Sequence, residues 1–214
     1  MFTQKMRVRL TFTDEVLATQ PGDPEIHASY ISSLAPNAKS KEEEIEAIGV
    51  DEFIEKGKTV FPRTPDGDPL IWTYQIKGFF KAAVKALHGV KGSHSSKVTA
   101  HQKLIDRAVF IYPSTDNRAG RKIPFEKYGK IHDCQRPLRA STAQGDRVAI
   151  SNSEAIDAGA QIEFDIEWFE DAKMSEALIC EWLDYGRYSG LLQWRNAGKG
   201  TFTWERVGVK VLSK

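Results

Sequence analysis

Residues 161–169 decide the fold and read Gln-Ile-Glu-Phe-Asp-Ile-Glu-Trp-Phe. Apolar and acidic side chains alternate along this stretch, which is the pattern of a β-strand with one buried face and one solvated face. We expect the core-facing set to be Ile162, Phe164, Ile166 and Trp168, and the water-facing set to be Glu163, Asp165 and Glu167. The stretch therefore predicts a half-buried strand.

Helices and further strands flank this stretch on both sides. The clearest helix ends at Leu87, because apolar side chains recur at i, i+3, i+4, i+7, i+8 and i+11 from Ile76 onward. A second helix is predicted at residues 175–185, and the other strands at residues 7–13, 107–112, 147–151 and 201–211. The order strand, helix, strand, strands, helix, strand is that of a ferredoxin-like split βαβ fold, which RNA-recognition motifs (RRMs) share.

The predicted fold class is therefore α+β: a ferredoxin-like or RRM-like antiparallel sheet with two helices and long insertions. We expect one domain over residues 1–214, because a chain of this length can bury a sizeable core. The insertions are expected at approximately residues 14–70 and 113–145, which are rich in turn-forming residues. Residues 89–102 are expected to form a mobile basic loop after the first helix.

The composition, 41% hydrophobic and 28% charged, is ordinary for a globular protein. No apolar run approaches the length of a membrane-spanning helix, and the N-terminus lacks the apolar segment of a signal peptide. We therefore expect a cytoplasmic protein in which Cys134 and Cys180 are free thiols. No Walker motif, Rossmann fingerprint, H-E-x-x-H or G-x-S-x-G occurs, which removes the commonest enzyme classes, and no cofactor is predicted.

The near-neutral net charge of +1 conceals a strong segregation of charge along the chain. Residues 71–147 carry a net charge of +10 and residues 185–214 carry +5. Residues 1–70 and 148–184 carry −5 and −9. A segregated basic surface attracts polyanions even on a nearly neutral molecule, whereas folding that interleaves the blocks would give a mixed surface.

The segment from Gly186 to Gly200 combines glycines with three basic residues and a tryptophan. Glycine lets a backbone approach phosphates closely, cations bind phosphate, and an indole offers a stacking surface for any base. The alternative is a flexible turn in which Trp194 folds back onto the core.

Residues 72–78 read Trp-Thr-Tyr-Gln-Ile-Lys-Gly and place a lysine and a glycine at a helix start, where free N–H groups and the helix dipole favour anions. This segment is similar to the I-P-G-S-S-x-K-G pattern of the RAMP superfamily, the RNA-binding subunits of CRISPR effector complexes. The run from Gly190 to Gly198-Lys199-Gly200 resembles the glycine-rich loop of that superfamily, which ends in G-x-G before a strand. The turn and strand at residues 155–164 look like a further, weaker match. The resemblance spans roughly residues 70–212. The chain looks like a remote member of the superfamily, and within it is most similar to the backbone-forming subunits.

The resemblance implies a protein that binds single-stranded RNA or single-stranded DNA in a basic groove and assembles side by side with itself or with other effector-type subunits. Backbone subunits of some effectors also cut RNA through a loop aspartate that recruits metal, but Asp106 and Asp116 have no recognisable context for that role. We therefore expect a non-catalytic protein without a cofactor or metal. The predicted nucleic-acid-binding residues are Lys77, Gly78, Lys81, Lys85, Lys97, Lys103, Arg107, Arg136, Arg139, Arg187, Tyr188, Trp194, Arg195, Asn196, Gly198, Lys199 and Gly200. Among them, the lysines and arginines are expected to meet phosphates, and Trp194, with Tyr188, to stack on bases.

Two other functions fit the same sequence. One branch of the superfamily cleaves CRISPR transcripts without metal through a histidine, which makes His94 and His101 candidate catalytic residues of an endoribonuclease. A protein-interaction module that mimics or blocks an effector subunit is the third hypothesis. His132-Asp133-Cys134 offers metal-ligand types without partners at zinc spacing, which favours a polar loop over a metal site.

Overall fold

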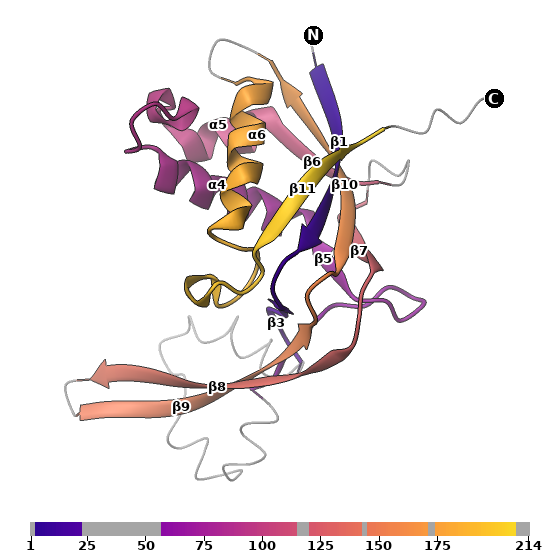
Figure 1. The fold of residues 1–214 in the computed structure, drawn as a ribbon, viewed down its shortest axis with the longest axis vertical. Helices are drawn as coiled ribbons and strands as arrows, with labels where there is room; N and C mark the ends of the chain where they lie inside the picture. The colour runs from indigo at the N-terminus through magenta and orange to yellow at the C-terminus, as the bar shows by residue number, and fades with distance from the viewer. Residues whose placement is uncertain (1–2, 23–56, 115–119, 143–144, 171–173, 209–214) are drawn as a thin grey trace, which may run out of the picture. The chain divides into compact units, whose positions relative to one another are not determined.

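The computed structural model describes residues 3–22, 57–114, 120–142, 145–170 and 174–208 (Figure 1). The chain forms two compact units. The first comprises residues 1–16, 62–130 and 156–214, and the second comprises residues 17–61 and 131–155. The predicted single domain with two insertions stays a prediction, although most of the second unit falls within the predicted insertions. Residues 23–56 of the first insertion lie outside the described residues.

The first unit contains the predicted ferredoxin-like antiparallel sheet, which confirms the α+β class. Its four core strands are β1 (Thr3–Phe12), β6 (Val109–Pro113), β10 (Gln161–Phe169) and β11 (Phe202–Val207). They lie in the order β11-β1-β10-β6, and all three pairings are antiparallel. When these four strands are numbered 1 to 4 along the chain, this is the order 4-1-3-2 expected of a split βαβ fold. Two further strands, β7 (Lys122–Lys127) and β5 (Leu70–Trp72), extend the sheet beyond the other end of β10.

Three α-helices of the first unit lie together on one side of this sheet (Figure 1). They are α4 (Thr73–Leu87), α5 (His101–Ala108) and α6 (Glu176–Asp184), with 3-10 turns η1 (His94–Lys97), η2 (Tyr185–Arg187) and η3 (Arg195–Ala197). The core forms where α4 packs on α6 and on the sheet. The ring centroids of Phe80 on α4 and Trp182 on α6 are 5.4 Å apart, and those of Phe79 on α4 and Phe202 on β11 are 5.2 Å apart. No helix among the described residues has the length and hydropathy needed to cross a bilayer.

Helix α5 corrects the sequence prediction, which placed a loop up to residue 102 and a strand from residue 107. The helix buries Leu104, Ile105 and Ala108, and Ala100 precedes it with a φ of 50°, in the left-handed region. A two-turn helix with three buried apolar residues offers too little periodicity to recognise, and the strand begins only at Val109.

The segment before α5 is fastened to the fold, which corrects the prediction of a mobile loop. Ser95 is fully buried, and its Oγ donates to Glu181 Oε2 at 2.5 Å and accepts from Trp182 Nε1 at 3.0 Å. The same carboxylate accepts from the backbone N–H of His94 at 2.6 Å and of Ser95 at 2.9 Å. Because the anchoring carboxylate belongs to α6, some 86 residues away, no local pattern announces it.

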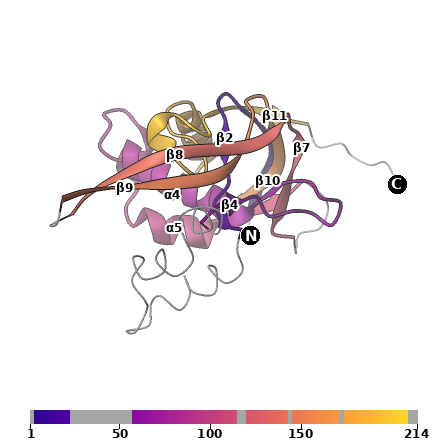
Figure 2. The same ribbon diagram turned by 90° about the horizontal axis from the view of Figure 1, so that it is seen from below.

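The second unit is built on a long hairpin of β8 (Ile131–Thr142) and β9 (Gly145–Ile156), which run side by side in Figures 1 and 2. Its sheet has the order β2-β9-β4-β3, with the short strands β2 (Val16–Leu17), β3 (Gln20–Pro21) and β4 (Thr59–Val60). Thr59 Oγ1 donates to Ser153 Oγ at 2.8 Å, which fastens β4 to the hairpin. Cys134 in this unit and Cys180 in the first unit are free thiols, as predicted.

Candidate nucleic-acid interface

The sheet face opposite the helices is covered by ion pairs. Asp165 on β10 lies across from Arg7 on β1 and accepts from its Nε at 2.7 Å, and Lys5 Nζ lies 2.8 Å from the same carboxylate. Burial works to raise the pKa of Asp165, but the hydrogen bonds from Arg7 and Lys5 hold that pKa below its ordinary value. The prediction that Asp165 faces water is therefore wrong, because only 3% of its surface is exposed.

A second group of ion pairs continues along the same face. Arg9 Nε donates to Glu163 Oε1 at 2.6 Å, and Arg9 Nη1 lies 2.9 Å from Glu205 on β11. Glu163 is buried as well, against the prediction. Burial, followed by the neighbouring Glu163, raises the pKa of Glu126 on β7. RRM-type recognition stacks bases on aromatic side chains of the central strands, and at these positions β1 and β10 carry paired charges instead.

The helical side of the first unit carries lysines that are exposed and that have no acidic partner among the described residues. Lys85 on α4, Lys97 on η1 and Lys103 on α5 are exposed, as is Lys91 between the first two elements. None of these four, which we call the helical basic surface, pairs with an acidic group within the part of the chain that the structure describes. Helix α4 packs against both η1 and α5, so the four residues belong to one layer.

Lys77 and Lys81, which the sequence predicted to meet phosphates, are engaged within the first unit, unlike Lys85. Lys81 Nζ lies 2.7 Å from Asp106 Oδ1 on α5. Lys77 is half-buried with its Nζ 5.3 Å from the centroid of the Phe110 ring, and burial above all lowers its pKa, against the influence of Asp106. Gly78, one residue further along α4, is exposed. Arg107 is also exposed, on α5.

The glycines of the loop between α6 and β11 serve close packing. A Cβ on Gly186 would lie 2.3 Å from the Phe202 ring, and a Cβ on Gly190 would lie 2.1 Å from the backbone of Gly200. Gly200 has a φ of +69°, which few other residues adopt, and its carbonyl accepts from the N–H of Leu191 at 2.9 Å. These glycines therefore close the loop on itself, with Leu191 buried as its apolar anchor.

Several groups of this loop that the sequence assigned to phosphate are already engaged. The N–H of Gly198 donates to Arg195 O at 3.0 Å, and that of Gly200 donates to Glu15 O at 2.7 Å. Lys199 Nζ lies 2.9 Å from Asp14 and 3.0 Å from Glu15. The hydrogen bond with Lys199 is the main cause of a lowered pKa at Asp14, and the same bond raises the pKa of Lys199.

Four other side chains of the loop point outward. Tyr188 is 79% exposed, and Arg187 beside it is exposed with a distant Asp184 oxygen at 3.9 Å. Trp194 is 39% exposed and has a φ of +55°, in the left-handed region, and Asn196 is exposed. Arg195 is half-buried. The outward side of the loop thus presents two aromatic rings and an arginine.

The remaining predicted residues are two histidines of the first unit and two arginines of the second unit. His94 is exposed on η1, and His101 is half-buried at the first position of α5. Arg136 belongs to the second unit and is only 8% exposed. The side chain of Arg139 lies outside the described residues.

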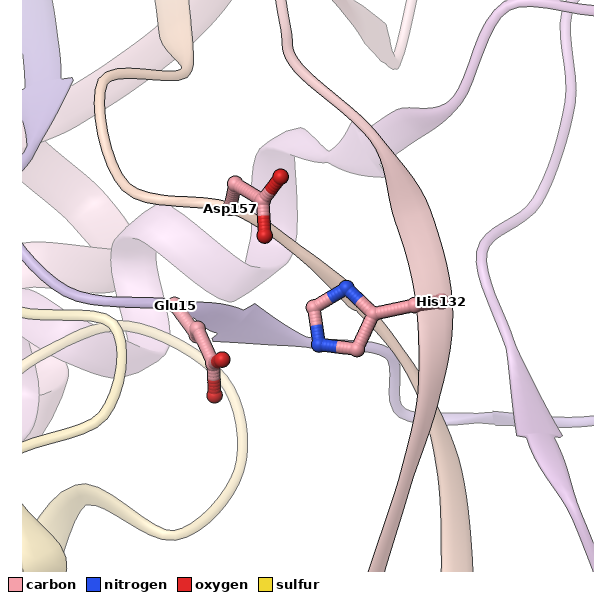
Figure 3. A group of neighbouring side chains, drawn as sticks. All are labelled: Glu15, His132 and Asp157. Atoms are coloured by element: carbon pink, nitrogen blue, oxygen red, sulfur yellow. The ribbon is translucent and has the colours of Figure 1, made fainter.

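Three of the described side chains, all of metal-ligand type, come from two different units of the chain. Figure 3 shows Glu15, His132 and Asp157, of which His132 belongs to the second unit and the other two to the first. Within the second unit, Asp133 of the His132-Asp133-Cys134 run lies 2.7 Å from Lys58 Nζ, in an ion pair. The absence of a metal stays a prediction.

Comparison with known proteins finds similarity among solved structures. No protein-family model matches the chain, and no curated protein matches it. Among solved structures, a chain of the cryo-EM structure of the type III-B Cmr-beta bound to cognate target RNA is similar, with a TM-score of 0.49 and 11% identity. The match covers 97% of this chain and 61% of that chain, so this chain spans about three fifths of its length.

Proposed function

We propose that the protein binds single-stranded RNA or single-stranded DNA through the helical side of its first unit, without cleaving the strand. The observation that carries the proposal is that charged side chains are paired on one side of the sheet and unpaired on the other. On the sheet face opposite the helices, cations and carboxylates neutralise one another in pairs. The helical basic surface leaves four exposed lysines without acidic partners among the described residues.

Unpaired surface cations are the feature that phosphate binding requires. A lysine that is already held by carboxylates must separate from them before it can meet a phosphate, whereas an exposed lysine only releases water and counterions. The lysines of the helical basic surface satisfy this condition, and Lys199 does not. Within the loop that follows α6, Arg187 is the most exposed cation.

Exposed aromatic rings favour a single strand over a duplex. Single-stranded nucleic acids offer unstacked bases, and stacking on an aromatic ring tolerates any base. Tyr188 and Trp194 supply such rings on the glycine-rich loop.

As part of the same proposal, copies of the protein assemble side by side along a strand. Measurement of the mass of the protein with and without a long oligonucleotide would test this assembly.

The experiment is a titration of labelled RNA and DNA strands of about 20 nucleotides, read by fluorescence anisotropy at several salt concentrations, with EDTA present and absent. Lys97→Ala with Lys103→Ala should weaken binding of all sequences and reduce the slope of log affinity against log salt by about 0.7 for each phosphate that the variant no longer neutralises. The matched control is Lys127→Ala with Lys130→Ala, which removes the same charge from β7 and the turn after it.

Three outcomes would contradict the proposal. A wild-type salt slope near zero removes the electrostatic basis. An equal decrease of affinity in the two double variants means that only net charge matters and that the helical side has no special part. If the wild type cleaves the strand and His94→Ala or His101→Ala abolishes that cleavage, the endoribonuclease is favoured instead.

A further inference from the structure

The first turns of α4 expose a tyrosine that has no role in the fold. Tyr74 is 65% exposed, and its side chain makes no hydrogen bond, ring contact or ion pair with any residue that the structure describes. Two other tyrosines of the first unit are engaged: Tyr128 donates to Asp68 at 2.8 Å, and Tyr185 stacks on Phe79 with 6.3 Å between ring centroids.

A glycine that the fold does not require lies one turn further along the same face. Residues four apart on a helix are neighbours, so Gly78 is adjacent to Tyr74 on the helix surface. A Cβ on Gly78 would meet nothing within 4 Å, and its φ lies outside the left-handed region. Glycine is, after proline, the least favourable residue for a helix interior, so its presence here lowers helix stability with no return in packing. What glycine does provide is room for another backbone to approach the helix closely.

The charges around this pair suit a polyanion. Lys81 and Lys85 continue the face of Tyr74 and Gly78 at the next two turns, about 10 and 16 Å from Tyr74 along the helix axis. The N–H of Thr73 donates to Arg121 O at 2.9 Å, which places the start of β7 beside the first turn of α4. There Lys122 Nζ lies 5.8 Å from the centroid of the Trp72 ring. Asp106 on α5 pairs with Lys81.

We propose that Tyr74 is the stacking platform for one unpaired base of the bound strand, and that the sugar-phosphate backbone next to this base passes over Gly78 toward Lys85. The proposal rests on the proposed function and adds to it a base-contacting residue. Phosphate contacts by lysine position a strand, whereas stacking is the contact through which the bases themselves contribute. Tyr74 lies on a helix, so its backbone is held more firmly than that of a loop aromatic.

The experiment compares an ordinary strand with an abasic strand of the same length, of about 20 nucleotides, which keeps the phosphates and lacks the bases. Uridylate RNA and thymidylate DNA are each tested with their abasic counterparts. Tyr74→Leu should weaken binding of the ordinary strand about 5- to 150-fold and leave binding of the abasic strand unchanged. Tyr74→Phe keeps the ring and should bind like the wild type. Tyr128→Leu, at an exposed tyrosine on the turn after β7, is the matched control and should not change affinity.

Gly78→Ala separates the backbone-approach role from a structural one. The substitution should raise the melting temperature, because alanine favours the helix, and should lower affinity for both the ordinary and the abasic strand. A glycine with only a structural role would lower both stability and affinity when replaced.

The outcomes distinguish this inference from the proposed function. Failure of the wild type to bind any strand overturns both. Normal wild-type binding with unchanged affinity in Tyr74→Leu overturns the stacking role alone, and so does an equal decrease of affinity for ordinary and abasic strands.

Discussion

Replacing Ser95 by alanine should lower the free energy of unfolding by about 2–4 kcal/mol. The side chain of Ser95 is fully buried and satisfies two groups at once: it accepts from Trp182 Nε1 and donates to the carboxylate of Glu181. Alanine leaves the buried indole N–H without an acceptor, which costs about 1–3 kcal/mol, and removes a hydrogen bond to a charged group, worth about 1.5–3 kcal/mol. The two effects share one site, so their sum is an upper bound.

Urea unfolding followed by far-UV circular dichroism measures this decrease in stability. In a melting experiment the same change should appear as a decrease of about 4–16 °C, since 1 kcal/mol shifts the midpoint of a chain of this size by about 2–4 °C. Ser96→Ala is the matched control, because its Oγ donates only to Ser93 O, at 2.6 Å, within a half-buried turn. That variant should be destabilised by no more than about 1 kcal/mol. If Ser95→Ala is destabilised as little as Ser96→Ala, the hydrogen bonds of Ser95 do not hold the segment that carries Lys97.

Two further predictions concern the loop after α6 and the ion pairs on the sheet. Gly190→Ala should lower the free energy of unfolding by at least about 1–3 kcal/mol, because its Cβ would meet the backbone of Gly200, whereas Gly208→Ala, with open space around it, should be neutral in the same urea titration. Equal stability of the two variants would mean that the loop is not closed at Gly190. The lowered pKa of Asp165 predicts a contribution to stability that is fully present above the ordinary aspartate pKa of about 3.9 and is lost as the pH falls through the lower pKa of the folded state. Asp165→Asn should therefore make unfolding less sensitive to acid below about pH 4, and an unchanged acid limb would refute the assignment.

The sequence by itself determined the kind and order of most elements of the first unit. Alternation predicted β10 with its observed limits, and the periodicity from Ile76 to Leu87 predicted α4, which begins three residues earlier. Both patterns are local consequences of burying one face of a strand or helix, so they can be read from neighbouring residues. The 4-1-3-2 strand order follows from the same element order, since it is the arrangement that connects these elements in a split βαβ fold.

Only the tertiary structure decided which charges remain available to a ligand. Asp165 carries the same alternating signature as a solvated carboxylate, yet it is buried because strand register brings Arg7 opposite it, from 158 residues away. Lys199 was predicted to meet phosphate, and the turn at Asp14 and Glu15 engages it. The charge of a side chain is a property of the residue, whereas its partner is a property of pairing between distant segments. The sequence could therefore predict a basic protein surface, and only the folded chain separates the paired cations from the unpaired ones.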